Sequence, residues 1–244
     1  MDSEITEALL EKLPQKRRVA ITTSYSKAPA FIIKALNECM TKLNYVRDTY
    51  DYIKDADGNY ILDRYGRRIP EGCHYNEQKM CIAMSDSMTN DEYTDVLHHE
   101  LGHFVDHAMG TISSNCDFQA AFEQTVQQLN LATPQGRAFL RDILDDAFST
   151  GAAYDLNVTD IISALTMNDS SVVREFYEEN VAYYRHENHY WGATTYDGTS
   201  LRKREKEIFA NIFAIETDNY RISRNFIERW FPQLVDSFVM SIQR

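Results

Sequence analysis

The sequence His99-Glu100-Leu101-Gly102-His103 constrains the fold of this chain more than any other stretch. Two histidines four residues apart lie on one face of an α-helix, because a helix completes a turn about every 3.6 residues. Imidazoles arranged in this way can bind one divalent metal ion such as Zn²⁺. Glu100 is then placed to act as a general base toward a water that the metal activates. The motif therefore predicts a helix here, and it favours a metal site over an ordinary polar helix face.

Local signals on both sides of the motif predict where its helix begins and ends. Thr89, with Glu92 three residues later, has the pattern of a capping box, and Gly110 is a suitable terminator. Between them, apolar side chains recur at helical spacing, at Tyr93, Val96, Leu97, Leu101, Phe104, Val105 and Ala108. We therefore expect the two histidines to lie beside a buried stripe, at the edge of the core.

The composition is that of an acidic chain large enough to form a normal hydrophobic core. The chain has 244 residues, 43% of them hydrophobic, and a formal net charge of −12. Nucleic acids and anionic membranes are not expected as partners, because phosphate binding requires clustered Lys and Arg. No apolar run reaches the roughly 18 residues of a transmembrane helix, and Met1-Asp2-Ser3-Glu4 does not resemble a signal peptide. We expect a cytoplasmic monomer, unless a leader has been removed.

The four cysteines do not have the spacing of a zinc ribbon or of a C-x-x-C redox pair. We interpret Cys39, Cys73, Cys81 and Cys116 as reduced thiols. A disulfide between Cys73 and Cys81 across a hairpin is the alternative.

The hydrophobic pattern predicts an α+β fold in which strands and helices of the first half are followed by helices alone. Expected strands are Arg18–Thr23, Val46–Ile53, Tyr60–Leu62, Cys73–Tyr75 and Lys79–Met84, with a hairpin turn at Asp57-Gly58-Asn59. Expected helices besides the motif helix are residues 3–13, Ser26–Leu43, Asp117–Leu131, Pro134–Phe148, Thr159–Leu165, Ser171–Tyr184, Arg202–Glu216, Asp218–Trp230 and one after Pro232, with His186–Ser200 as a loop. Residues 1–110 would form a subdomain with a small mixed sheet and the motif helix. Residues 111–244 would form a helical subdomain that carries the third metal ligand, the two halves making one catalytic unit.

A catalytic zinc ion usually has three protein ligands, so the two histidines need a third residue. Glu207 is our preferred candidate, because it shares a helix face with the small or polar residues Ala210, Asn211 and Ala214. A face of small residues would let this helix approach the motif helix closely. Glu123 is the alternative, at about the separation found in thermolysin-like enzymes. Those enzymes carry an Asp four residues after the Glu, whereas this chain has Gln127.

Three other residues near the motif are interpreted as lying outside the set of ligands. His107 is two turns, or about 12 Å of helix rise, from His99, so one ion cannot bind both. We interpret it as a neighbour of a ligand or a surface residue. His98 points away from the His pair and is expected to be structural or solvated. Asp106 shares the ligand face, where it either orients a ligating histidine or lies at the surface.

The stretch from His99 to Asp106, with the later Glu207-x-Phe-Ala-x-x-Phe, resembles the catalytic domain of anthrax lethal factor and its gluzincin relatives. The resemblance implies a zincin-like fold in which His99, His103 and Glu207 bind zinc and Glu100 is the catalytic base. It also implies that a residue upstream of the Glu stabilises the oxyanion. Tyr190 is our first candidate, followed by His186 and Tyr196. In zincin folds, the strand before the motif helix, here Lys79–Met84, forms the upper edge of the cleft.

A second resemblance covers roughly residues 90–242. Four segments are similar to metallopeptidase-like domains of prophage minor head proteins: Asp160–Thr166, His186-x-x-x-Tyr190-Trp191, Glu207–Phe213 and Trp230-Phe231-Pro232. Together, the two resemblances imply a zinc-dependent metalloendopeptidase acting on peptide or protein substrates. One alternative is a non-catalytic zinc-binding module associated with phage or prophage particles. Another is a toxin-like effector that uses the same chemistry on a narrow target.

Overall fold

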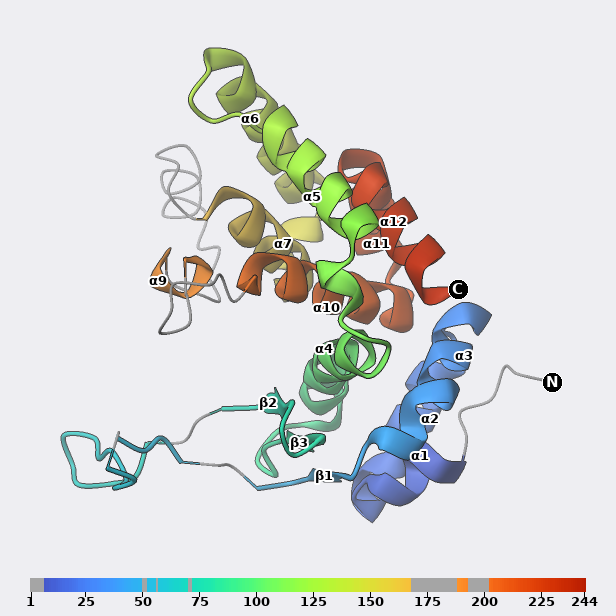
Figure 1. Ribbon diagram of the computed structural model, residues 1–244, viewed down its shortest axis with the longest axis vertical. Coiled ribbons are helices and arrows are strands. Elements are labelled where there is room, and N and C mark those ends of the chain that lie inside the picture. The colour runs from blue at the N-terminus through green and yellow to red at the C-terminus, as the bar shows by residue number, and fades with distance from the viewer. Residues whose placement is uncertain (1–6, 50–51, 56, 70–71, 168–187, 193–201) are drawn as a thin grey trace.

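The computed structural model describes residues 7–49, 52–55, 57–69, 72–167, 188–192 and 202–244. Helices make up most of this part of the chain, and one small mixed sheet lies beside the motif helix (Figure 1). The predicted α+β class is therefore confirmed. None of the described helices is both long and apolar enough to cross a membrane.

The first helices cover one side of the motif helix, and one of them replaces a predicted strand. They are α1 (Glu7–Lys12), η1 (Gln15–Arg17), α2 (Arg18–Tyr25), α3 (Ala30–Cys39) and η2 (Met40–Lys42). The strand predicted for Arg18–Thr23 is wrong. The hydroxyls of Thr22 and Thr23 bond to carbonyl oxygens one helical turn earlier, and Ile21 and Tyr25, four residues apart, are both buried. Tertiary burial thus outweighs the preference of β-branched residues for strands.

The helix predicted for Ser26–Leu43 is shorter than expected at its start. Ser26 ends α2 as its C-cap, and α3 begins only at Ala30, after Pro29. A proline disfavours helical geometry in the residue before it, which explains the break.

The sheet consists of β1 (Tyr45–Arg47), β2 (His74–Asn76) and β3 (Cys81–Ala83) in the order β1-β3-β2. β3 pairs in parallel with β1 and antiparallel with β2. The strands predicted for Cys73–Tyr75 and Lys79–Met84 are present as β2 and β3, whereas the strand predicted for Val46–Ile53 ends at Arg47. β3 lies in the centre of the sheet, between β1 and β2. β2 is the edge strand that packs against the motif helix.

All four cysteines are free thiols, so the alternative of a Cys73–Cys81 disulfide is wrong.

An arm projects between β1 and β2, comprising residues 52–55 and 57–69 (Figure 1). The hairpin predicted at Asp57-Gly58-Asn59 is present, as the bridge between Lys54 and Tyr60 shows. The chain then turns a second time and forms a bridge between Leu62 and Arg68. The arm is therefore a short meander rather than a single hairpin.

The remaining helices form the second half, and one of them packs directly on the motif helix. They are α5 (Cys116–Gln128), α6 (Pro134–Thr150), α7 (Leu156–Thr166), α9 (Asn188–Trp191), α10 (Lys203–Asp218), α11 (Arg221–Trp230) and α12 (Pro232–Ile242), with the short turns η3 (Ile112–Ser114) and η4 (Ala152–Tyr154). The motif helix is α4 (Asn90–Ala108), and it has the predicted capping box. α10 packs against both α4 and α7. The helix predicted for Ser171–Tyr184 lies outside the described residues.

Gly102 brings α4 and α10 unusually close together. A Cβ atom at this position would lie 2.7 Å from Ala210 Cα and 2.9 Å from its carbonyl oxygen. Both of these are backbone atoms, which cannot move without shifting the whole helix. Glu207 lies one turn before Ala210, so the contact also fixes how far this carboxylate reaches toward α4.

Replacing Gly102 with Ala is expected to destabilise the protein by up to about 2 kcal/mol. Helix propensity would favour Ala by about 1 kcal/mol, but overpacking against a backbone costs about 1–3 kcal/mol and displaces α10. Denaturant unfolding and zinc titration would measure the two effects, and zinc affinity should fall as well. Gly192→Ala is a matched control, because its Cβ meets no described atom within 4 Å. Wild-type stability and zinc affinity in Gly102→Ala would contradict the role given to this contact.

Candidate metal centre

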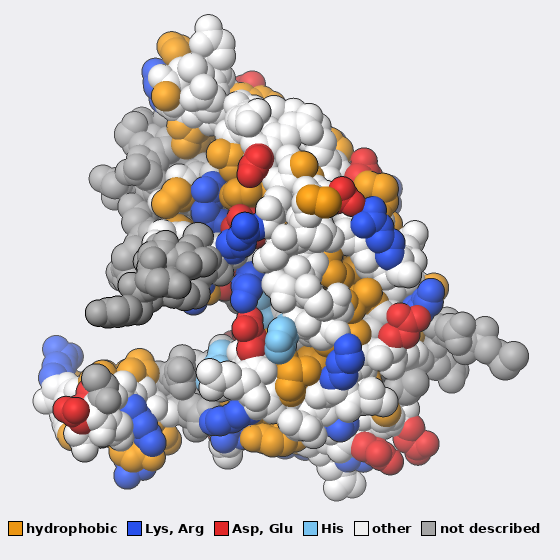
Figure 2. Space-filling model, viewed as in Figure 1, with side chains coloured by type: hydrophobic (Ala, Val, Ile, Leu, Met, Phe, Trp, Pro, Cys, Tyr) orange, Lys and Arg blue, Asp and Glu red, His pale blue; other side chains and the backbone are white. Residues whose placement is uncertain are grey.

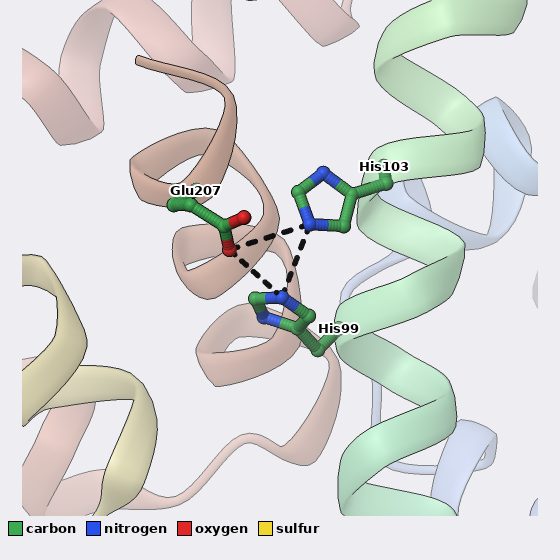
Figure 3. Close-up of side chains that lie close together, drawn as sticks. All are labelled: His99, His103 and Glu207. Carbon is green, nitrogen blue, oxygen red and sulfur yellow. Dashed lines mark hydrogen bonds and ion pairs between the residues drawn. The ribbon is translucent and has the colours of Figure 1, made fainter. Parts of the chain in front are cut away.

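Three side chains from two helices converge on one point (Figure 3). His99 and His103 extend from α4, and Glu207 extends from α10. Glu207 Oε2 lies 3.1 Å from His99 Nε2 and 3.4 Å from His103 Nε2, and the two Nε2 atoms are 3.1 Å apart. His99 and Glu207 are buried, and His103 is partly exposed. This group could bind a metal ion.

A chain of buried polar groups fixes the orientation of His99. His99 Nδ1 lies 2.9 Å from Asn211 Oδ1, and Asn211 Nδ2 donates to Asp160 Oδ2 at 2.7 Å. Because the Asn211 amide donates to Asp160, its oxygen is the atom that faces the imidazole and accepts the Nδ1 proton. The lone pair on His99 Nε2 is then directed at the other two residues. Spacing alone places Asn211 on the helix face of Glu207, but nothing in the sequence indicates this role of Asn211 or that of Asp160.

The electrostatics at this point favour a positive charge among the three residues. Glu207 Oε2 is buried and accepts no well-aligned hydrogen bond from the described residues. Burial by itself would lower the pKa of His103, but the carboxylate of Glu207 outweighs this effect and raises it to about 9. Burial would likewise raise the pKa of Glu207, but His103 and His99 hold it well below its usual value. A group that favours a positive charge in this way is also suited to binding a metal cation.

Glu100, the predicted base, lies on the same helix and is held by the edge of the sheet. Its Oε2 accepts a hydrogen bond of 2.7 Å from the backbone N–H of Tyr75, in β2. The hydroxyl of Tyr75 in turn lies 2.9 Å from His107 Nδ1. This contact agrees with the prediction that His107 is not itself a metal ligand. The short strand β2 therefore positions the carboxylate of Glu100.

Tyr190 reaches the centre from the short helix α9. Its hydroxyl donates to Glu207 Oε1, the oxygen that does not face the histidines. Burial and then the charge of Glu207 raise the pKa of Tyr190, so the phenol stays protonated. Trp191, the next residue, is buried in the core. The other two oxyanion candidates, His186 and Tyr196, lie outside the described residues, as does most of the loop predicted for His186–Ser200.

Glu123, the alternative third ligand, does not belong to the centre. It lies on α5, where its side chain is exposed. Among the residues that the structure describes, His99, His103 and Glu207 are the only group of three potential ligands with atoms within 4.8 Å of one another. The Glu207 candidate is therefore the one that the structure brings to the histidines.

Asp106 and His98 both have structural roles in the core. Asp106 is buried, and its two oxygens accept hydrogen bonds from the backbone N–H and the hydroxyl of Ser113, at 2.7 and 2.6 Å. Of its two predicted roles, the one at the surface is wrong, because Asp106 is buried and anchors the turn after α4. Its charge also contributes to raising the pKa of His103. His98 is fully buried, where its Nδ1 pairs with Asp218. Of the two readings of His98, the structural one is confirmed.

Solvent reaches the centre at His103, whose side chain is 17% exposed. Figure 2 shows histidine, acidic and basic side chains at the inner end of a hollow that the arm borders. Lys206 Nζ lies 2.7 Å from Glu77 Oε1, so an ion pair joins α10 to the turn between β2 and β3. The next residue after Lys206 is Glu207, and this ion pair therefore ties the start of α10 to the strand that holds Glu100.

No protein-family model, curated protein or solved structure significantly matches this chain. A function must therefore be argued from the residues that meet at the centre and from the chemistry they allow.

Proposed function

We propose that this protein is a zinc-dependent metallopeptidase of the gluzincin type, with a zincin-like fold around α4. His99, His103 and Glu207 would bind Zn²⁺, and a peptide or protein would be the substrate. The proposal depends chiefly on one observation. The three potential ligand atoms are separated by 3.1, 3.1 and 3.4 Å. Ligands at about 2.0–2.1 Å from a tetrahedral zinc ion are about 3.3 Å from one another.

The donor set also favours a catalytic metal over a structural one. Two imidazole nitrogens and one carboxylate oxygen are typical of catalytic zinc sites, which keep a position open for water. Structural zinc sites usually have four protein ligands and are rich in cysteine. Among the described residues, no cysteine and no second acid belongs to this group. Glu207 Oε2 is buried and faces the two histidine nitrogens, and it supplies the negative charge that a dication needs.

The residues around the ligands can carry the proton transfers of peptide hydrolysis. Bound zinc would polarise the scissile carbonyl and lower the pKa of the attacking water. Glu100 accepts a proton from that water while the oxygen of the water forms a bond to the carbonyl carbon. When the C–N bond breaks, Glu100 returns the proton to the leaving amine. The backbone N–H of Tyr75 holds the carboxylate in place throughout.

Tyr190 has the second role in the proposed reaction. Its phenol donates its single proton to Glu207 in the resting protein, and it can turn this O–H from Glu207 to the carbonyl oxygen as negative charge develops there. A neutral donor at this point stabilises the transition state more than the substrate, because the charge exists mainly in the former.

Removing and restoring the metal tests the proposed function. Treatment with a chelator is expected to abolish hydrolysis of an unstructured protein substrate, and one equivalent of zinc should restore it. Cleavage can be followed by mass spectrometry, which also identifies the bonds broken. A protein that binds zinc but cleaves nothing would contradict the proposal and favour the non-catalytic, phage-associated alternative. Cleavage that persists at full rate without metal would contradict it as well.

A further inference from the structure

We propose that a second cavity, beside the metal centre, receives a lysine or arginine side chain of the peptide substrate. This inference rests on the proposed function and names its substrate class. The cavity has a volume of about 860 Å³, and its lining includes Glu92, Asp95, Tyr154, Asp155, Asn157 and Asp218.

Two helices that line this cavity, α4 and α7, also carry residues of the metal centre. Asp95 lies four residues before His99 on α4, so the two share a face and are about 6 Å apart along the axis. Asn157 lies three residues before Asp160 on α7, the residue that holds Asn211. A peptide that reaches the centre can therefore place a neighbouring side chain in the cavity.

The cavity is negatively charged, and one of its carboxylates lacks a partner. Its described lining includes Glu92, Asp95, Asp155 and Asp218 but no Lys, Arg or His. Three of these acids have structural bonds: Glu92 in the capping box, Asp155 with the backbone of Asn157, and Asp218 with His98. Asp95 has no hydrogen bond or ion pair with the described residues. Although solvent reaches Asp95, partial burial and then the charge of Asp218 raise its pKa to about 6.

Asn157 is a second and independent sign of a ligand. Its side chain lines the cavity and is only 7% exposed, and its Oδ1 accepts no hydrogen bond from the described residues. A buried amide oxygen without a partner is unfavourable, and an N–H donor in the cavity would satisfy it. Tyr154 and Tyr220 stand at the rim, 81% and 51% exposed. Aromatic faces beside carboxylates are well suited to organic cations.

The spacing of the acids argues for an organic cation and against a metal ion. A metal ion needs several oxygens that converge at bonding distance. No three potential ligands at this cavity, among the residues described, lie as close together as those of the metal centre. Dispersed carboxylates can surround the extended ammonium or guanidinium end of a side chain.

Binding of two short fluorescein-labelled peptides would test this inference. The peptides have the same sequence except that one carries Arg and the other Gln at every third position. Fluorescence anisotropy with the Glu100→Gln protein, at about 0.15 M salt to screen distant charges, avoids any cleavage. We expect the Arg peptide to bind more tightly, and Asp95→Asn to weaken its binding about tenfold. Tyr154→Ala, a change at an exposed position, should also weaken binding.

Asp142→Asn is the matched control, because Asp142 is exposed on α6 and outside the cavity lining. It removes the same charge and should leave the affinity unchanged. Equal affinity for the two peptides would overturn the inference. Equal losses of affinity for the Arg peptide in Asp95→Asn and Asp142→Asn would overturn it as well. They would mean that the peptide responds only to the net charge of the protein. Because the readout is binding, a protein that never cleaves peptides could still give the expected result, so the two proposals can fail separately.

Discussion

Replacing Glu100 with Gln is expected to reduce peptide hydrolysis by about 10²–10⁴-fold, the usual contribution of a general base. Gln has nearly the same shape, and its carbonyl oxygen can still accept the hydrogen bond from the backbone of Tyr75. Its amide cannot take a proton from water at neutral pH, so the attacking step loses its base. The zinc content should stay at the wild-type value, because Glu100 is not one of the three ligands. Steady-state kinetics with metal analysis of the same sample would measure both.

Glu123→Gln provides the control for this substitution. It makes the same chemical change at an exposed position on α5, and it should leave kcat and zinc content unaltered. A Glu100→Gln protein with wild-type kcat would exclude Glu100 as the base. A Glu100→Gln protein that had also lost its zinc would mean that the change disturbs the centre itself. The hydrogen bond to β2 would then be the more important function of this side chain.

The sequence predicted the motif helix well because the signals for it are local. A capping box and a regular apolar stripe lie within the helix itself, so neither depends on distant parts of the chain. The convergence of Glu207 was also predictable. The small residues Ala210 and Ala214 indicated that their helix packs closely on another. The residue on α4 that allows this contact, Gly102, is evident only from the structure.

Features that depend on partners far along the chain could not be predicted in the same way. Asp160 precedes Asn211 by 51 residues, and nothing near either one indicates that they bond. Asp106 fits the ligand face by spacing, but the turn after α4 brings Ser113 to both of its oxygens. The segment beginning at Arg18 has the composition of a strand and is a helix because of what it packs against. Spacing therefore identified candidate ligands, whereas the contacts that hold them depend on tertiary structure.

The zinc affinity of Glu207→Gln, compared with that of Glu123→Gln, tests the central claim most directly. Glu207 supplies the only carboxylate among the three converging side chains, and the amide that replaces it brings no negative charge to a buried dication. We expect wild-type protein and Glu123→Gln to bind one zinc ion per chain with equal affinity. We expect Glu207→Gln to bind it at least about 100-fold more weakly. This loss is larger than that from removing a residue that only orients a ligand, which is about 10–100-fold. Wild-type affinity in Glu207→Gln, or no zinc binding by the wild-type protein, would contradict the metal centre described above.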